Sequence, residues 1–323
     1  MLKRLLLFLI LFFSAALTFS QDANALGNPV KISNSSNDVI NPATVADSKG
    51  YLHVVWQELT PGQVWTGVNP GIYYSRWNGD TWSTPLKISE NTDFAENPAI
   101  AVDSNNTVHV VWDDGTYNSG IPQVVHKTRT STGTWSSIET LPIPAGAISS
   151  RFPKIAINSA NEPNVFYTGN TDGYKDSIYQ TKKTAGNWTS PQLISTNVSG
   201  NNITDSQWVD IRDDDAGNIH AAYWSFTQGV FYRKLTNDTF SSPVLVHLSY
   251  TMESIKLNAT PLGEVFITWY EDSDSSIRVR WTQDGAWQSP VTLTTTSQRS
   301  FWGYPIMGVT TDSKERAHVG WGE

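Results

Sequence analysis

The chain has 323 residues, a net charge of −8 and no cysteine. Without cysteine it can form neither disulfides nor a zinc–thiolate site, and thiolate catalysis is excluded. An acidic chain without a basic run disfavours nucleic acid and anionic membranes as partners. Its stability must therefore come from a large hydrophobic core, which a chain of this length can bury.

The first residues have the pattern of a secretory signal peptide. Lys3 and Arg4 precede an apolar run from Leu5 to Phe13, and small and polar residues follow. This run is too short to span a bilayer, and no later segment approaches the roughly 20 apolar residues of a membrane helix. We therefore predict a signal peptide over residues 1–25, no membrane insertion, and a protein that is secreted or exported to the periplasm or cell surface.

A short sequence motif recurs along the rest of the chain. Its two clearest copies run from Asp47 to Trp56 and from Asp103 to Trp112, and both end in His-Val-Val-Trp. The fainter copies begin at Asn158, Asp214, Thr260 and Asp312. A second motif, an aromatic residue followed by small residues and usually proline, comes after each of the first five copies. It begins at Trp82, Trp135, Trp188, Phe240 and Trp287.

Each repeat is predicted to contain an inner strand, the His-Val-Val-Trp strand, a third apolar strand and a short strand after the second motif. Four strands roughly every 50 residues are typical of a propeller blade. We therefore predict an all-β protein, a β-propeller of about six four-stranded blades over residues 26–323. The turn before the second strand should be of type I and closed by a left-handed residue such as Gly50 or Asn106.

The two ends of the predicted ring do not form complete blades. Residues 29–33 match the fourth-strand segment 85–89, whereas the chain ends after the second strand of the sixth repeat. We expect residues 29–33 to pair as the outer strand of the last blade, which would lack its third strand and expose strand edges. A seventh blade is the alternative if the natural chain continues past Glu323.

Residues that recur in every repeat are poor candidates for a single active site. The repeated histidines lie one per blade, so we predict structural roles rather than a metal site. They are His53, His109, His220 and His318. The aromatic residues that end the second strand are predicted to pack between neighbouring blades. No pattern indicates a calcium site or a cofactor.

Carboxylates follow the strand-ending aromatic by two residues in several repeats. Glu58, Asp114 and Glu271 are such residues, on the face where propeller enzymes carry their active sites. Their recurrence favours a structural role, as partners of turn amides or of an arginine such as Arg76, with catalysis or ligand binding as the alternative.

Charged residues replace small ones on three adjacent inner strands. Where the first two repeats have Ala43 and Ala99, the next three have Lys154, Asp210 and Lys256. These charges would lie near the central channel, either as ion pairs between blades or as part of a ligand site.

The loops that enter the inner strands carry arginines, carboxylates and aromatic residues on one face of the ring. Such groups at one mouth are what recognition of an acidic or polyhydroxy sugar requires, although ordinary polar loops have a similar composition. Together with the carboxylates above and one inner-strand arginine, the candidate ligand-binding residues are Glu58, Asp114, Arg151, Asp205, Trp208, Arg212, Glu253, Glu271, Arg299, Trp302 and Tyr304.

One turn between a third and a fourth strand resembles a known repeat. Ser75–Trp82 reads Ser-Arg-Trp-Asn-Gly-Asp-Thr-Trp, which is similar to the Asp-box of bacterial neuraminidases, Ser-x-Asp-x-Gly-x-Thr-Trp, with Trp77 in place of the Asp. Together with the His-Val-Val-Trp repeats, the chain resembles secreted sialidase-like propellers over most of residues 28–323. The resemblance implies the propeller fold.

Sialidases of that group bind the substrate carboxylate with three arginines, and use a Tyr nucleophile activated by Glu and an Asp acid/base. A sialidase of this kind would require Arg151, Arg212 and Arg299 to converge on one pocket that also holds Tyr304 and Glu253 or Asp205. We expect the arginines not to converge, because their repeats are well separated around a six-fold ring.

We therefore expect a monomeric, exported propeller that binds a glycan or an extracellular protein through its top face, without a cofactor. The alternatives are a sialidase-type glycoside hydrolase and a non-catalytic scaffold module of a larger surface protein. Whether the protein is an enzyme is left open by the residues.

Overall fold

A computed structural model describes residues 30–59, 71–90, 95–115, 122–170, 176–196, 206–225, 228–249, 252–295, 306–312, 314 and 316–322. The predicted signal peptide lies outside these residues and stays a prediction. All regular secondary structure in the described residues is β-strand. Within them, no helix is long and apolar enough to cross a membrane.

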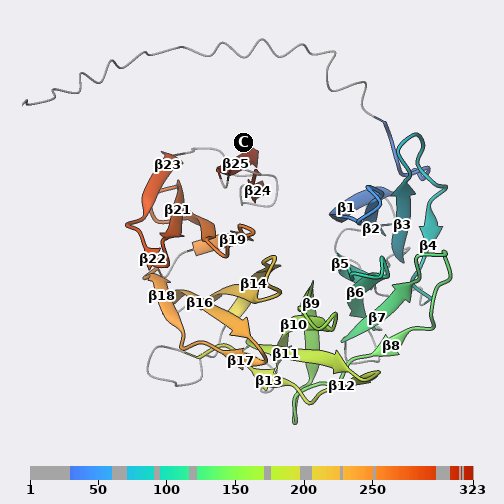
Figure 1. Ribbon diagram of the computed structural model, residues 1–323, viewed down its shortest axis with the longest axis horizontal. Helices are drawn as coiled ribbons and strands as arrows, with labels where there is room; N and C mark the ends of the chain where they lie inside the picture. Colours follow the sequence, from blue (N-terminus) through green and yellow to red (C-terminus); the bar gives the residue numbers. More distant parts are fainter. Residues whose placement is uncertain are drawn as a thin grey trace, which may run out of the picture.

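The described strands form six antiparallel sheets that follow one another along the chain (Figure 1). The first contains β1 (Asp38–Ala46), β2 (Leu52–Leu59), β3 (Gly71–Trp77) and β4 (Leu86–Lys87). The second contains β5 (Ala95–Val102), β6 (Val108–Asp114), β7 (Gln123–Arg129) and β8 (Glu139–Thr140). The third contains β9 (Ser149–Ile157), β10 (Pro163–Asn170), β11 (Asp176–Thr184), β12 (Asn187–Trp188) and β13 (Gln192–Leu193).

The remaining sheets repeat this pattern. The fourth contains β14 (Ser206–Asp213), β15 (Ile219–Ser225), β16 (Gly229–Thr236), β17 (Thr239–Phe240) and β18 (Val244–His247). The fifth contains β19 (Met252–Ala259), β20 (Val265–Glu271), β21 (Ser276–Gln283), β22 (Ala286–Trp287) and β23 (Val291–Thr295). The last contains β24 (Ile306–Thr311) and β25 (Ala317–Gly322).

In the first five sheets the first four strands are hydrogen-bonded in chain order, from an inner strand to a short outer one. In the third, fourth and fifth sheets a further strand (β13, β18 or β23) pairs with the third strand. The sheets lie around a common centre, with β1, β5, β9, β14 and β19 innermost (Figure 1). The all-β class and the four-stranded antiparallel units are thus as predicted. The number of blades and the closure of the ring stay predictions.

The expected pairing of residues 29–33 with the last sheet is not seen in the described residues. Residues 30–34 form no strand there, and β24 and β25 make a two-stranded sheet. In the other sheets the outer strand pairs with a third strand. The last sheet has no described third strand with which residues 30–34 could pair.

The hydrophobic core lies between neighbouring sheets. Trp112 at the end of β6 is fully buried in a cluster with Val55, Ile72 and Tyr74 of the preceding sheet. The equivalent aromatic residues of the next three sheets are buried against their preceding sheets in the same way: Tyr167, Tyr223 and Trp269. The predicted packing role of these aromatics is therefore confirmed. In the last sheet, the equivalent Trp321 is 39% exposed.

The second motif provides another contact between sheets. Trp135 meets Tyr74 of the preceding sheet edge-on, with ring centroids 5.0 Å apart. Comparable edge-on pairs join the third, fourth and fifth sheets to the one before: His126 with Trp188, Phe166 with Phe240, and Tyr232 with Trp287. Neighbouring sheets among the first five are therefore held together by two aromatic contacts.

The predicted turns before the second strands are confirmed. The closing residues all have positive φ, namely Gly50, Asn106, Asn161, Gly217 and Gly263. In the first turn, Asp47 Oδ1 accepts hydrogen bonds from the amides of Lys49 and Tyr51, both at 2.9 Å. Side chains that bond their own turn in this way favour it over a continuing strand.

The repeated histidines fasten this turn to the third strand. His220 is fully buried, with Nε2 3.1 Å from Asp214 Oδ2 and Nδ1 2.7 Å from the hydroxyl of Tyr232. His53 has the same arrangement with Asp47 and Tyr74. The described residues contain no cluster of three or more metal-ligating groups. The predicted structural role of the histidines is thus supported by geometry.

We expect His220→Ala to lower the free energy of unfolding by about 2–4 kcal/mol, because it removes a partner from two buried polar groups and leaves a cavity. His318→Ala is the matched control. Its side chain contacts Asp312 at 3.2 Å but is 58% exposed, so the loss should stay below about 1 kcal/mol. Urea unfolding followed by tryptophan fluorescence measures both. Equal losses would contradict the structural role of the buried histidine.

Candidate functional site

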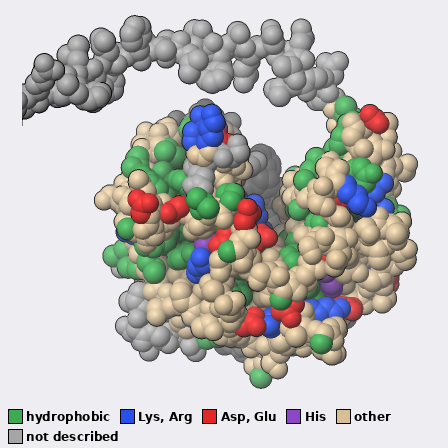
Figure 2. Space-filling model, viewed as in Figure 1, with side chains coloured by type: hydrophobic (Ala, Val, Ile, Leu, Met, Phe, Trp, Pro, Cys, Tyr) green, Lys and Arg blue, Asp and Glu red, His purple; other side chains and the backbone are tan. Residues whose placement is uncertain are grey.

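The inner strands line a cavity of about 460 Å³ near their common centre. The surface is hollowed there, and acidic and basic side chains lie together near the hollow (Figure 2). Five inner strands contribute to the lining. Among its residues are Asn41, Ala43, Asn97, Ala99, Phe152, Lys154, Trp208, Asp210, Arg212 and Lys256.

A β-bulge at one end of this cavity recurs in every described inner strand of the five larger sheets. The register between inner and second strand shifts there in all five pairs. In four of them the bulge places a residue in the left-handed region: Asn41, Asn97, Phe152 and Ser254, with φ of 51°, 53°, 56° and 61°. Bulges redirect side chains at barrel rims and near functional sites. Here they bring a set of equivalent side chains to the mouth of the cavity.

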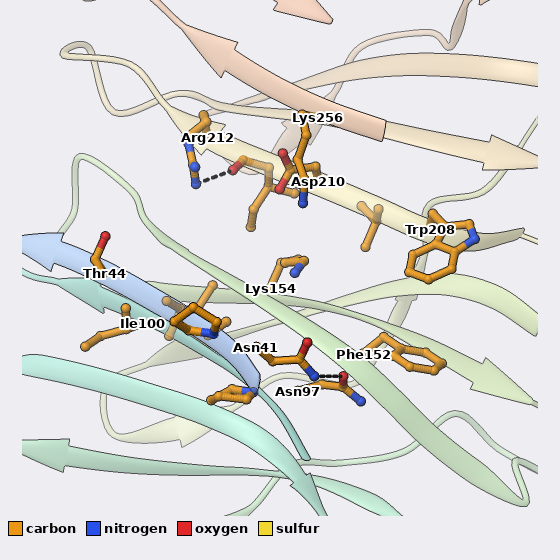
Figure 3. Close-up of a pocket in the computed structure, with 17 residues that line it drawn as sticks. Asn41, Thr44, Asn97, Ile100, Phe152, Lys154, Trp208, Asp210, Arg212 and Lys256 are labelled. Carbon is orange, nitrogen blue, oxygen red and sulfur yellow. Dashed lines mark hydrogen bonds between the residues drawn. The ribbon is translucent and has the colours of Figure 1, made fainter. Parts of the chain in front are cut away.

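Phe152 is the exceptional member of this set. Asn tolerates left-handed backbone, whereas a bulky side chain there costs on the order of 1–2 kcal/mol. The Phe152 ring lies 6.1 Å from that of Trp208, between centroids. Trp208 occupies the equivalent position of the next sheet and is 42% exposed. The strained backbone therefore contributes one half of an accessible aromatic pair at the mouth (Figure 3).

Asp113 forms hydrogen bonds to two of these bulges. Its Oδ1 accepts a hydrogen bond from the Phe152 amide at 2.9 Å, and its Oδ2 accepts one from Asn97 Nδ2 at 2.8 Å. Gln57, the equivalent residue one sheet earlier, accepts bonds from Asn41 Nδ2 and the Asn97 amide. The residue after the strand-ending aromatic thus links the bulge of its own sheet to that of the next.

Burial raises the pKa of Asp113 to about 7, although its hydrogen bond from Asn97 and the nearby Arg151 charge oppose this shift. The carboxyl group has no exposed surface. It is therefore part of the scaffold under the mouth rather than a group that can touch a ligand.

Arg151 lies beside this scaffold and is engaged by it. Its Nη2 donates to Glu96 Oε2 at 3.0 Å, and its Nε lies 3.7 Å from Asp113 Oδ2. Its guanidinium carbon is 5.0 Å from the Phe152 ring centroid. The sequence prediction placed this arginine at the mouth, and the structure shows that carboxylates and a ring already surround it.

The wall of the cavity below the mouth is charged on one side. Lys154, Asp210 and Lys256 point into the cavity from β9, β14 and β19 (Figure 3). The lining residues of β1 and β5 carry no charge, and they have Ala43 and Ala99 at the positions equivalent to Lys154 and Lys256. Consecutive sheets therefore give the cavity a charged side and an uncharged side.

The alternative of ion pairs between these three residues is not supported. Within the described residues, none of them pairs with another, and Asp210 Oδ2 accepts the Leu257 amide at 2.8 Å instead. The pKa of Lys154 lies below its usual value because burial disfavours the ammonium; Asp210 opposes this, and the Lys256 and Arg212 charges add to it. The charged wall thus carries more positive than negative charge.

The three predicted carboxylates have structural partners and do not line the cavity. Glu58 Oε1 accepts a hydrogen bond from Trp56 Nε1, and Asp114 Oδ2 accepts one from Trp112 Nε1, both at 3.0 Å. Glu271 accepts a bond from the Ser249 hydroxyl at 2.7 Å and lies beside His247. Their described partners also include the side-chain amide of Asn37, which donates to Glu58 Oε2 at 3.1 Å. These contacts agree with the predicted structural role.

The other predicted site residues divide into two groups. Trp208 and Arg212 line the cavity, at its mouth and at its other end (Figure 3). Four others lie outside the described residues: Asp205, Arg299, Trp302 and Tyr304. The side chain of Glu253 is not described either. Arg212 Nη1 donates to the Ile211 carbonyl, whereas Arg151 Nη2 donates to Glu96. Convergence of all three predicted arginines stays untested.

Sequence analysis did not identify the mouth residues Asn41, Asn97 and Phe152. The signal that marks them is Phe152-Pro153 at the position where earlier repeats have Asn-Pro. A bulky residue that replaces Asn before Pro indicates a backbone position of unusual cost. The bulge that gives this replacement its meaning is visible only in the strand register.

No known protein family matches the sequence, and no curated protein matches it. Solved structures resemble it in fold. A protein of unknown function from Dyadobacter fermentans has a TM-score of 0.64 at 11% identity, over 90% of this chain and 95% of that one. The BP39L lectin from Burkholderia pseudomallei has a TM-score of 0.60 at 14% identity, over 87% and 80%.

A third likeness is to an enzyme. The NanB sialidase from Streptococcus pneumoniae has a TM-score of 0.59 at 10% identity, over 93% of this chain and 69% of that one. At such identities these likenesses show the fold alone. They agree with a propeller-like architecture of the kind predicted.

We expect Asp113 to make the stability of the protein depend on pH. Because the folded state raises its pKa from 3.8 to about 7, the neutral acid stabilises the fold, fully below pH 4, and this contribution is lost as the pH rises through 7. Asp113→Asn removes the titration. Relative to this variant, the wild type should lose about 2–3 kcal/mol of unfolding free energy between pH 5 and pH 8. Urea unfolding at both pH values tests this, and a constant difference between the two proteins would refute it.

Proposed function

We propose that this protein binds carbohydrate at the mouth of its central cavity. The observation that carries the proposal is the aromatic pair of Phe152 and Trp208, flanked by the amide side chains of Asn41 and Asn97. Aromatic faces pack against the apolar face of a sugar ring, and amide oxygens accept hydrogen bonds from its hydroxyl groups. The two Asn side chains would act through their oxygens, because Asn41 Nδ2 already donates to Gln57 and Asn97 Oδ1, and Asn97 Nδ2 to Asp113. Equivalent positions of four sheets thus provide the two kinds of contact that a sugar needs.

The backbone strain at Phe152 supports a functional role for its ring. Asn occupies the same bulge in two other sheets and adopts it at lower cost. Strained residues of this kind are kept where the surrounding structure enforces them, and they concentrate at ligand sites. A purely structural bulge would have no reason to carry a bulky side chain.

Two further observations agree with a glycan ligand. The structures of similar fold include a lectin and a sialidase, so this architecture is used for carbohydrate recognition in other proteins. The predicted export would place the mouth where extracellular glycans are found. An extracellular protein as partner, and a monomeric state, stay predictions of the sequence.

The contacts of Arg151 favour binding over hydrolysis of a sialoside. Such hydrolysis needs several guanidinium groups on one substrate carboxylate. Arg151 is instead engaged by Glu96 and Asp113, and Arg212 lies at the other end of the cavity. We therefore propose a carbohydrate-binding propeller without assigning it a reaction.

We expect Phe152→Asn to weaken glycan binding roughly tenfold while leaving stability unchanged or raising it by up to about 1 kcal/mol, because it removes both the stacking surface and the strain. Leu262→Asn, an 81% exposed residue in a turn away from the cavity, is the matched control and should bind as the wild type does. A glycan array identifies the ligand, and titration calorimetry with thermal unfolding measures both effects. Full affinity in the Phe152 variant would exclude the aromatic pair as the site.

A further inference from the structure

We propose that the ammonium groups of Lys154 and Lys256 form an anion site in the central cavity, which holds a carboxylate or sulfate group of an acidic glycan. This inference rests on the proposed function, because the same glycan would occupy the mouth above. It adds the chemical class of the ligand and assigns the two lysines, which the mouth residues alone do not determine.

Both ammonium groups lack a protein partner among the described residues, where neither Lys154 nor Lys256 forms an ion pair or hydrogen bond. Several other lysines that are not exposed have a carboxylate partner, as shown by Lys127 with Glu90, and Lys183 with Glu139, at 3.1 Å and 2.5 Å. The partly buried Lys87 also has no such partner among these residues. Since an unpaired charge away from bulk water is costly, two such groups in one cavity point to a bound counter-charge.

The charges in the cavity are not balanced. Asp210 lies on the strand between the two lysines, but it is one carboxylate among three cationic side chains, the third being Arg212. Its Oδ2 is already bonded to the Leu257 amide. The cavity is therefore positively charged although the whole chain has a net charge of −8. A positively charged cavity favours the binding of an anionic group.

The lysines lie near the mouth along the inner strands. Lys154 follows Phe152 by two residues on β9, just beyond the bulge, and both residues line the cavity. Asp210 follows Trp208 in the same way on β14. A sugar stacked at the mouth would therefore direct an acidic substituent to the level of the lysines, the position at which the uncharged side has the small Ala99.

The lowered pKa of Lys154 is consistent with this arrangement. Burial and the neighbouring positive charges disfavour its ammonium form, and a bound anion would favour that form again. A bound anion would thus supply the counter-charge that favours the ammonium form of Lys154.

Inorganic sulfate tests the anion site directly. At millimolar concentration and constant ionic strength, sulfate in place of chloride should raise the melting temperature of the wild type and of Lys49→Met, which removes an exposed lysine outside the cavity. The double variant Lys154→Met, Lys256→Met should lose this rise, and the corresponding double Arg variant should retain it. An equal rise in wild type and double Met variant overturns the anion site.

Matched oligosaccharides then test the ligand class by titration calorimetry. One contains a uronic acid, the second its carboxyl-reduced form, and the third a sulfated neutral sugar. We expect the wild type to bind at least one of the acidic forms tenfold or more tighter than the neutral form, and the double Met variant to lose this preference. Which acidic form binds distinguishes a carboxylate from a sulfate ligand.

Failure of the two proposals would look different. If the neutral form binds as tightly as both acidic forms, and Phe152→Asn still weakens all of them, the acidic ligand class is refuted and carbohydrate binding stands. If the wild type binds no glycan in the array, carbohydrate binding is refuted, and the glycan ligand inferred for the lysines is refuted with it.

Discussion

The structure depends on the burial of each sheet against its neighbours. A large aromatic side chain at the end of the second strand, such as Trp112 or Trp269, fills the space between two sheets and is fully buried there. Because each inner strand is held through such contacts, its position relative to the inner strand of the next sheet is fixed. The central cavity is the space that remains between strands held in this way.

This packing explains how the structure can hold the Phe152 backbone in a conformation that costs energy. The left-handed Phe152 is bonded through its amide to the buried Asp113, which belongs to the preceding sheet. The same bridge, made by Gln57 one sheet earlier, holds an Asn that adopts the bulge at lower cost. The hydrogen bonds that hold Asn in the bulge of one sheet thus also hold Phe152 in the next. Residues that depart from a repeat in this way concentrate at functional sites.

The same division between repeated and unique residues separates stability from recognition. Histidines, turn carboxylates and aromatic residues recur, and His220, His53 and Trp56 each bond a partner within their own sheet. Lys154 and Lys256 replace the alanine of the first two sheets and have no such partner in the described residues. Charges that add nothing to the fold and are costly to bury are best explained by a ligand that compensates them.

The sequence by itself determined the strands, the turns and the structural histidines, because each repeat forms them through short-range contacts that its own residues encode. Gly50 and Asn106 show their left-handed turns in the sequence for that reason. Only the tertiary structure decided that Phe152 meets Trp208, that Glu58 binds an indole, and that Lys154 has no ion-pair partner among the described residues. These relations join residues of different strands or sheets across a bulge, and a one-residue change of register alters which side chains meet.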